Sequence, residues 1–356
     1  MYDEWVKLFE KYGQEYPAEY AQLTTNMLDV TDLVDEYQTG DQLATRVASS
    51  DVLQQLAKAN PQFWGGAADL ASSNKTALKD DGNFTPDNYA GRNVYYGVRE
   101  FGAATATNGI NLHVGSRAYV STLMVFSDYL KAAIRLVAIQ HLPSIFIFTH
   151  DSLAVGEDGP THEPIEQLAM LRTIPNVQVF RPADAHETVE AWKVIAKTTD
   201  KPSVLIASRQ KLPVLDEAKG ADVEKGAYII SPAKTQEPDG ILLASGSEVS
   251  LALEVKVKLQ KQGDYDIQVV SVPSIERFKE QSADYQEQVL PTGVRHRLAV
   301  EMGNTQAWYQ FVGLDGRVVG VDTFGKSGKG PEVVADYGFT VDHVVDVFNK
   351  MWEDQN

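Results

Sequence analysis

Strand-sized apolar runs alternate with helical stretches along most of this chain, and that alternation restricts the fold more than any other feature. Short apolar runs predict buried strands, and longer stretches with helical spacing predict helices. The clearest series has strands at Ser144–His150, Val177–Phe180 and Ser203–Ala207, with helices at Pro164–Thr173 and Ala185–Thr198. Asp184 and Glu187 are spaced as a capping box at the start of the second helix. Strands joined in this way by helices predict a parallel sheet covered by helices.

A second alternating series follows a stretch without periodicity. Residues 212–239 contain several Gly and Pro residues and no long periodic segment, which is typical of a linker. Beyond it we expect strands near Ile241–Ala244, Ile267–Val272, Arg297–Glu301 and Val318–Asp322, and helices near Glu248–Gln262 and Val341–Trp352. The sequence therefore predicts an α/β protein with two domains, 36–211 and 240–356, each a mainly parallel sheet covered by helices.

The first 35 residues are predicted to be helical and contain no expected strand. Trp5, Leu8, Phe9 and Tyr12 recur at helical spacing, so they share one face. Two interpretations stay open, namely a connector that extends from the first domain and a surface helix packed on it.

The charge and composition exclude several classes of function. A net charge of −17 disfavours nucleic acid and anionic membrane surfaces, which are bound through clustered Lys and Arg. The chain has no cysteine, and no apolar run approaches a membrane span of about 20 residues. Because the N-terminus has neither a basic start nor an apolar stretch, we expect no signal peptide and a cytoplasmic location. A small phosphorylated substrate is still possible, because a few focused cations can override the global field.

The first candidate site follows the strand Ser144–His150. Ligands of open α/β sheets lie at the carboxyl ends of parallel strands. At this strand end stand His150, Asp151 and Ser152, followed by the loop Gly156–His162, which is dense in acids and His for a chain with only 7 His. An Asp/Gly turn with a histidine that caps the next helix is the plainer interpretation. A metal site is disfavoured, because the ligands lack the i, i+4 spacing of a helical zinc motif.

Two further clusters precede this loop in the sequence. Glu100 stands in an apolar stretch expected to be helical, where a carboxyl is costly unless it is protonated or paired, and an ion pair with Arg99 would also explain it. Leu123, Phe126 and Tyr129 are spaced i, i+3 and i+6 on a helix expected to continue through residue 135. Such a stripe is more often core than binding site.

In combination and order, these motifs closely resemble transketolase over residues 1 to 356. The strings that carry the resemblance are Gly97–Gly102, Phe126–Tyr129, Thr149–Ser152, Gly156–Pro164, Ala207–Gln210, Gly246–Val249 and Thr323–Gly325. The resemblance implies a pyrimidine-binding domain and a transketolase C-terminal domain. It also implies transfer of a two-carbon ketol unit from a ketose phosphate to an aldose phosphate, as in the pentose phosphate pathway.

The resemblance implies roles in binding thiamine diphosphate. Glu100 matches the glutamate that hydrogen-bonds the aminopyrimidine ring and favours the tautomer that deprotonates the thiazolium carbon. Phe126 matches the aromatic side chain that stacks on the pyrimidine, and Tyr129 lines the same pocket. Leu123 stands where a third aromatic side chain is expected, and Asp69 matches a residue that helps to place the cofactor across a dimer interface.

The resemblance also implies a substrate site. Arg46, His150 and Arg209 match the cations that bind the sugar phosphate, and Ser73 adds a hydroxyl. Two residues of the loop are implied to meet the reacting end of the sugar. Asp158 matches the carboxylate that reads the 2-hydroxyl, and His162 matches a catalytic residue near the carbonyl. Besides Leu123, the chain departs from the family at Val114-Gly115-Ser116 and at Ala154, where other small or aromatic residues are usual.

The largest departure is an absence. The family's N-terminal domain binds magnesium and the diphosphate through a Gly-Asp-Gly motif, and this chain contains no Gly-Asp-Gly. Residues 1–35 resemble the tail of that domain and the linker behind it. We therefore expect a fragment that forms a homodimer, is inactive alone, holds no metal, and binds neither thiamine diphosphate nor Mg²⁺ tightly.

Two other functions are weighed against this one. The beta subunit of a thiamine-dependent 2-oxo acid dehydrogenase has a similar pair of domains, but its substrate does not require phosphate-binding cations. A non-catalytic dimerisation module would not be expected to retain Glu100, Phe126, His150, Asp158 and Arg209 together.

Overall fold

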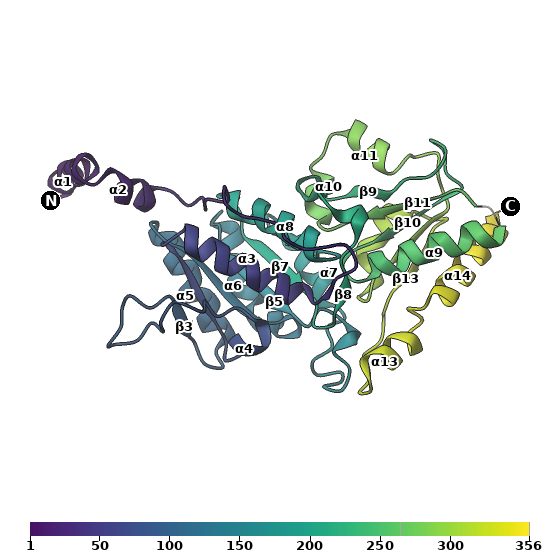
Figure 1. Cartoon of the computed structure of the whole chain (residues 1–356), viewed down its shortest axis with the longest axis horizontal. Helices are drawn as coiled ribbons and strands as arrows, with labels where there is room; N and C mark the ends of the chain where they lie inside the picture. Colours follow the sequence, from purple (N-terminus) through teal and green to yellow (C-terminus); the bar gives the residue numbers. More distant parts are fainter. Residues whose placement is uncertain (264, 356) are drawn as a thin grey trace.

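The computed structural model describes residues 1–263 and 265–355. Asp264 and Asn356, which both fall in the expected second domain, lie outside this range. Two sheets with their helices lie side by side along the longest axis of the molecule, and a pair of helices extends beyond the first (Figure 1).

The first sheet is entirely parallel, as predicted. Its six strands have the order β3-β2-β4-β5-β7-β6. They are β2 (Phe63–Ala67), β3 (Asn93–Tyr95), β4 (Arg117–Leu123), β5 (Ile145–Thr149), β6 (Gln178–Phe180) and β7 (Ser203–Ala207). Every residue of β4, β5 and β7 is buried, which explains why these strands read as continuous apolar runs. Leu123 pairs with Thr149, and Thr149 with Ala207, so these strands end level with one another.

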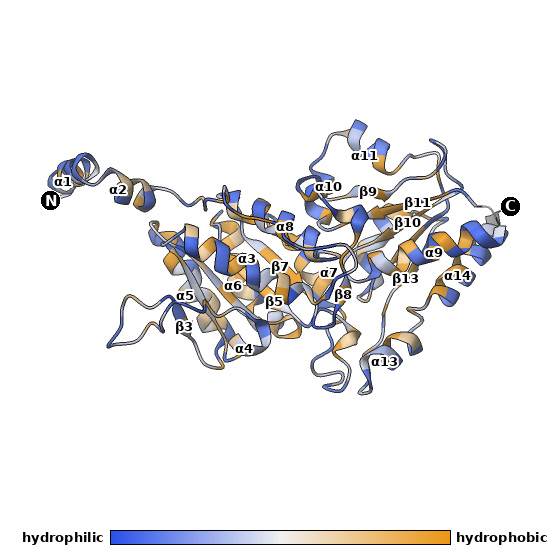
Figure 2. Ribbon diagram, viewed as in Figure 1, coloured by the Kyte–Doolittle hydropathy of each residue, from blue (hydrophilic) through white to orange (hydrophobic). Residues whose placement is uncertain are grey.

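Helices cover both faces of this sheet. Helices α3 (Thr45–Ala59) and α8 (Ala185–Lys197) share a core with the side chains of Ile145 and Ile147. Helices α5 (Glu100–His113) and α6 (Ser127–Ile139) share the opposite core with Phe146 and Phe148. Hydrophobic residues gather on the strands and on the sides of the helices that face them (Figure 2). Two short helices, α4 (Ala71–Asn74) and α7 (Gln167–Arg172), complete the domain.

Helix α7 is shorter than the predicted helix Pro164–Thr173. The side chain of Gln167 accepts a hydrogen bond from the backbone N–H of Ile165 at 3.0 Å. The preceding residues therefore form a turn, and the helix begins only at Gln167.

The predicted capping box of α8 is half correct. The Asp184 carboxylate accepts from the backbone N–H of Glu187 at 2.9 Å, as expected for an N-cap. Glu187 does not return the bond to Asp184. Its carboxylate accepts from the N–H of Ala183 at 2.7 Å and from the hydroxyl of Tyr228, in the second sheet, at 2.8 Å. A contact between the domains thus replaces the second half of the box.

The second sheet has the order β13-β12-β10-β11-β9, and its edge strand β9 is antiparallel. The strands are β9 (Tyr228–Ser231), β10 (Gly240–Ala244), β11 (Ile267–Ser271), β12 (Arg297–Val300) and β13 (Arg317–Val319). The helices are α9 (Glu248–Gly263), α10 (Ile275–Lys279), α11 (Ala283–Val289), α12 (Tyr309–Val312), α13 (Gly330–Asp336) and α14 (Val341–Gln355). The prediction of a mainly parallel sheet is confirmed, whereas β9 lies in the stretch 212–239 where no strand was expected.

A short two-stranded sheet joins the two ends of the first domain. Strand β1 (Gln42–Leu43) pairs antiparallel with β8 (Leu212–Pro213), so residues that lie far apart in the sequence meet at its boundary. The core that contains α3 and α8 continues through Val255 of α9 and Phe348 of α14, which makes the interior continuous between the domains.

The N-terminal helices α1 (Tyr2–Glu15) and α2 (Pro17–Thr24) extend away from the first domain (Figure 1). Neither helix has a buried residue, and the rings of Phe9 and Tyr20 lie 4.7 Å apart between their centroids. This arrangement favours the connector over the packed surface helix. The prediction of helix through residue 35 is wrong after Thr24, because the chain there runs without regular structure and buries Leu28 and Leu33.

Val114 is strained at the end of α5. Its φ of +68° and ψ of 166° fall in a region that is essentially restricted to glycine, at a cost of about 1–3 kcal/mol. The substitution Val114→Gly removes that strain and loses about 0.5–1 kcal/mol through chain entropy. We expect Val114→Gly to raise the free energy of unfolding by about 1 kcal/mol in a guanidinium titration. The control is Val257→Gly on the exposed side of α9, which should lose about 0.3–0.5 kcal/mol. A Val114→Gly chain no more stable than wild type would show that the backbone is not strained there.

Candidate functional site

All the candidate site residues lie at one edge of the first sheet. That edge is formed by the carboxyl ends of its parallel strands, where the sequence predicted a ligand. The residues that follow the strand ends are Asp69 and Ser73 after β2, Glu100 after β3, Phe126 and Tyr129 after β4, His150, Asp158 and His162 after β5, and Arg209 after β7. Arg46 reaches the same edge from the first turn of α3.

Two arginines, Arg46 and Arg209, converge on His150 at this edge. Burial, as the largest cause, and the charges of Arg46, Arg209 and His162 together lower the pKa of His150 to about 3. Burial and the charge of Arg209 also lower the pKa of Arg46. Arg46 donates to the backbone carbonyl of Ser73 at 2.8 Å, and Arg209 to that of Val155 at 3.5 Å. Neither guanidinium is paired with a carboxylate within residues 1–263 and 265–355, so the cluster is suited to an anion.

The hydrogen bonds of His150 define its protonation. The Thr149 hydroxyl donates to the side-chain oxygen of Asn74 at 2.8 Å, so its oxygen is the acceptor for His150 Nδ1, also at 2.8 Å. A neutral His150 therefore carries its proton on Nδ1 and leaves Nε2 as an acceptor. His150 has a φ of +63°, an uncommon backbone conformation at this sheet edge.

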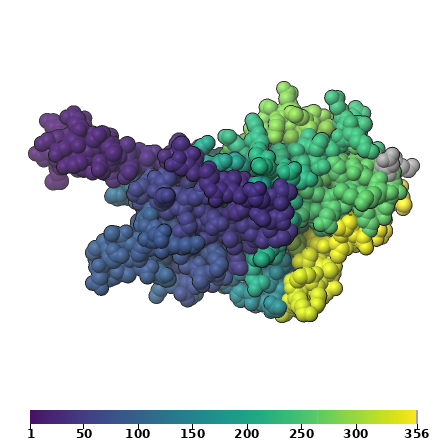
Figure 3. Space-filling view, viewed as in Figure 1, coloured from purple at the N-terminus to yellow at the C-terminus, as the bar shows by residue number. Residues whose placement is uncertain are grey.

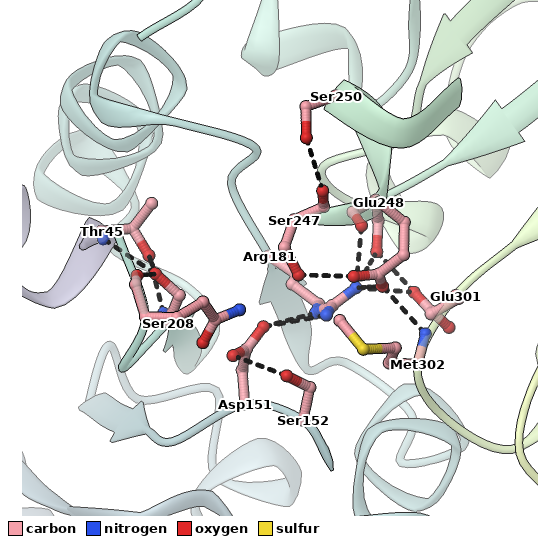
Figure 4. Close-up of polar contacts among 12 residues, drawn as sticks. Thr45, Asp151, Ser152, Arg181, Ser208, Ser247, Glu248, Ser250, Glu301 and Met302 are labelled. Carbon is pink, nitrogen blue, oxygen red and sulfur yellow. Dashed lines mark hydrogen bonds and ion pairs between the residues drawn. The ribbon is translucent and has the colours of Figure 1, made fainter. Parts of the chain in front are cut away.

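Two buried hydroxyl residues fix the backbone positions of Arg46 and Arg209 relative to each other. Ser208 donates its backbone N–H to Thr45 Oγ1 at 2.7 Å, and Thr45 donates its backbone N–H to Ser208 Oγ at 3.0 Å (Figure 4). Thr45 precedes Arg46 and Ser208 precedes Arg209, so this exchange ties the start of α3 to the end of β7. Sequence analysis missed this pair, because periodicity does not report contacts between distant residues.

The aromatic residues lie beside the cation cluster, although not as predicted. Leu123 is the last residue of β4 and Tyr129 belongs to the first turn of α6, so the expected stripe on one helix is wrong. The strand continues to Leu123 because all seven of its residues are buried in the sheet. Phe126 lies 6.1 Å from Tyr129 and 5.4 Å from His162 between ring centroids, edge-on to the histidine.

Glu100 lies in a helix, as predicted, but it is the first residue of α5 and is partly exposed, so the expectation that its carboxyl is desolvated is wrong. A carboxylate is favoured at a helix N-terminus by the helix dipole. The alternative of an ion pair with Arg99 is also wrong, because the Arg99 guanidinium bonds to the carbonyl of Tyr96 at 3.0 Å. Asp69 and Asp158 are exposed at the same edge.

A buried ion network joins the two domains behind His150. Arg181 contacts Asp151 at 2.8 Å and Glu248 at 2.6 Å (Figure 4). Arg172 contacts Glu301 at 2.7 Å. Burial alone would lower the pKa of Arg181, but the carboxylates of Glu248, Asp151 and Glu301 raise it above its usual value. The sequence placed Asp151 and Glu248 in motifs, yet gave no sign that one arginine links them.

The donor set fits part of thiamine diphosphate. A carboxylate at a helix start, Glu100, and the rings of Phe126 and Tyr129 suit an aminopyrimidine, which needs one acidic partner and an aromatic wall. No group of three or more metal-ligating side chains occurs in the described part of the chain. The described helices also include none that is long and apolar enough to cross a bilayer.

Two family models match the chain. The model described as transketolase, pyrimidine binding domain, matches residues 41–214, and the transketolase-like C-terminal domain matches residues 226–340. The transketolase of Bacillus subtilis is 49% identical over 350 residues, which are 96% of this chain and 52% of that protein. The transketolase of Geobacillus stearothermophilus is 52% identical over 87% of this chain and 47% of its own length. The chain thus spans about half the length of the curated relatives it matches.

Solved structures agree. A transketolase of Pichia stipitis in complex with sedoheptulose 7-phosphate matches with a TM-score of 0.92 and 36% identity, over 99% of this chain and 53% of that one. A split-gene transketolase, an inactive beta4 tetramer, matches in fold with a TM-score of 0.68 and 24% identity, over 88% of this chain and 99% of that one.

The pair Thr45–Ser208 gives a prediction. Ser208→Ala removes the acceptor of a buried backbone N–H, which costs about 1–3 kcal/mol. We expect a loss of that size in the free energy of unfolding from a urea titration. The control is Ser72→Ala, an exposed serine on α4. Equal stability of the two variants would mean that the Thr45–Ser208 hydrogen bonds do not fix the positions of Arg46 and Arg209.

Proposed function

Because this chain belongs to the transketolase family, we propose that it forms the pyrimidine- and sugar-binding part of a transketolase. The reaction would be the transfer of a two-carbon ketol unit from a ketose phosphate to an aldose phosphate. The observation that carries this proposal is that Arg46 and Arg209, which have no carboxylate partner among the described residues, lie beside His150 at the same sheet edge as Glu100 and Phe126.

The phosphate of the sugar would be bound by Arg46 and Arg209, which come from α3 and from the end of β7 and lie close enough for the charge of Arg209 to lower the pKa of Arg46. Ser73 would add its hydroxyl, and neutral His150 would accept a hydrogen bond on Nε2 from a hydroxyl of the sugar, not from the phosphate. Asp158 would read the 2-hydroxyl of the sugar, and His162 would stand near its carbonyl. The Pichia stipitis relative, whose structure is a complex with sedoheptulose 7-phosphate, supports a sugar phosphate as the ligand.

Thiamine diphosphate is the proposed cofactor. When bound, it supplies the carbon nucleophile of ketol transfer. Glu100 would exchange a proton with the aminopyrimidine ring, while Phe126, Tyr129 and Leu123 would form the wall of its pocket. Asp69 would contact a cofactor bound across a subunit interface. We place the ligands of magnesium and of the diphosphate in the part of the longer relatives that this chain does not match, so the chain alone should bind both weakly.

A homodimer is the proposed assembly. Helices α5 and α6 pack together on one face of the sheet, and their outward sides carry large apolar residues. These are Phe101, Leu112, Tyr129, Leu136 and Ile139, each at least half exposed. An apolar surface of this kind on two adjacent helices is typical of an interface between subunits.

The two alternatives fit less well. A 2-oxo acid dehydrogenase beta subunit acts on a substrate without phosphate and would not need the cluster of Arg46, His150 and Arg209. A non-catalytic module would need neither that cluster nor Glu100.

The dimer is tested by sedimentation equilibrium at micromolar concentration. We expect a mass of twice 39.2 kDa, and a shift toward the monomer when Leu136 and Ile139 on α6 are both replaced by Asp. The paired control places Asp at Leu314, an exposed residue of the second domain. A wild-type chain that sediments only as a monomer would refute the assembly.

The catalytic proposal is tested in a chimera that joins the N-terminal half of the Bacillus subtilis relative to this chain. Glu100→Gln should lower kcat about 10²–10⁴-fold, because an amide cannot exchange the proton with the ring. Glu254→Gln, on the exposed side of α9, serves as the control. Deuterium exchange at the thiazolium carbon should slow in parallel. If Glu100→Gln exchanged and turned over like the control, the proposed role would be wrong.

A further inference from the structure

The loop that carries Asp158 and His162 lies directly on a loop of the second domain, residues 325–330. The two loops meet at the lower edge of the molecule, where residues near 155–160 adjoin the residues before α13 (Figure 3). A Cβ added to Gly156 would lie 2.8 Å from the backbone N of Gly330, and one added to Gly330 would lie 2.8 Å from the carbonyl O of Ala154. Ser327 Oγ also donates to the carbonyl of Glu157 at 2.7 Å. Backbone therefore packs against backbone, with no room for intervening side chains.

Glu163 occupies the centre of this contact. It follows His162 directly and is only 2% exposed. A Cβ added to Gly325 would lie 1.9 Å from Glu163 Oε2, so the carboxyl rests on the bare backbone of Gly325. Neither carboxyl oxygen makes a hydrogen bond of good geometry within the described residues, although the backbone N–H groups of Gly156 and Lys326 lie near enough to favour the charged form. A buried carboxyl with such weak polar contacts is costly, and it needs a reason other than stability.

The pKa of Glu163 is consistent with its burial against Gly325. Burial raises the pKa of Glu163 to about 7, and the backbone N–H groups of Gly156 and Lys326 offset only part of that rise. The nearby ammonium groups are already paired, Lys326 with Asp336 and Lys329 with Glu332. The remaining charged neighbours along the loop are Glu157, Asp158 and the imidazole of His162. Glu163 is thus held by shape and by backbone dipoles.

Glu163 directly follows His162, one of the candidate site residues. His162 contacts the ring of Phe126, with 5.4 Å between centroids. We propose that Glu163 is a positioning residue: seated against Gly325, it fixes the Gly156–His162 loop to the second domain and so holds His162 against Phe126. The second domain, which provides none of the proposed substrate contacts, would then set the place of a residue near the reacting carbonyl. The importance of that place rests on the proposed function, whereas the coupling itself does not.

The contact with Phe126 provides the measurement. The ring current of Phe126 shifts the imidazole proton signals of His162, which can be observed in the whole chain labelled with ¹³C-histidine. The signals are assigned by their loss in His162→Asn. Phe126→Leu removes the ring current and defines the signal position of a released histidine. Because no cofactor, substrate or activity is needed, failure here would not be confused with failure of the Glu100 test.

Four variants test whether the contact between Glu163 and Gly325 positions the loop. Gly325→Ala places a methyl group where the Glu163 carboxyl lies, and Glu163→Ala removes that carboxyl. Glu163→Gln preserves its shape, and Gly293→Ala adds a methyl group in open space of the same domain. We expect the first two to move the His162 signals most of the way to the Phe126→Leu values. Glu163→Gln and Gly293→Ala should stay close to wild type, and exposed His141 should not move in any variant.

The proposal is overturned if Glu163→Ala, folded by circular dichroism, leaves the His162 signals at their wild-type positions. It is also overturned if Glu163→Gln moves them as far as Glu163→Ala, because shape would then not be what positions the loop. Should Gly325→Ala fail to fold, the Glu163 variants alone decide the question.

Discussion

The arrangement of this molecule depends on one buried guanidinium. Arg181 is 1% exposed and lies between Asp151 of the first domain and Glu248 of the second. A buried charge is tolerated only when it is paired, and removal of one partner typically costs about 3–5 kcal/mol. The orientation of the domains is therefore coupled to this contact. Because Asp151 directly follows His150, the same contact also holds the strand end from which the candidate site is built.

The network also explains how an acidic chain keeps a cationic site. The overall charge is −17, and the carboxylates of Asp151, Glu248 and Glu301 are buried. These carboxylates are bound by Arg172 and Arg181, so they do not neutralise the two site arginines. The charges that bind the domains together and those available to a ligand are thereby separated.

The sequence predicted the features that depend on periodicity and missed those that depend on distant pairs. Buried parallel strands such as β5 and β7 are continuous apolar runs, so the sheet and the edge that carries the site could be predicted. Leu123 was misplaced because i, i+3 spacing cannot show that a strand has not yet ended. The Arg181 network joins residues 30 and 67 positions apart, and Arg172 and Glu301 are 129 apart, distances over which local patterns carry no information.

The central claim is that this chain by itself contains a site for the phosphate of a sugar. The most direct measurement is a calorimetric titration of the 356-residue chain at pH 7 with fructose 6-phosphate and with fructose. The phosphorylated sugar should bind, the affinity should fall about tenfold or more in Arg209→Ala, and fructose should show no saturable binding. Equal binding of the two sugars, or an unchanged affinity in Arg209→Ala, would contradict the claim.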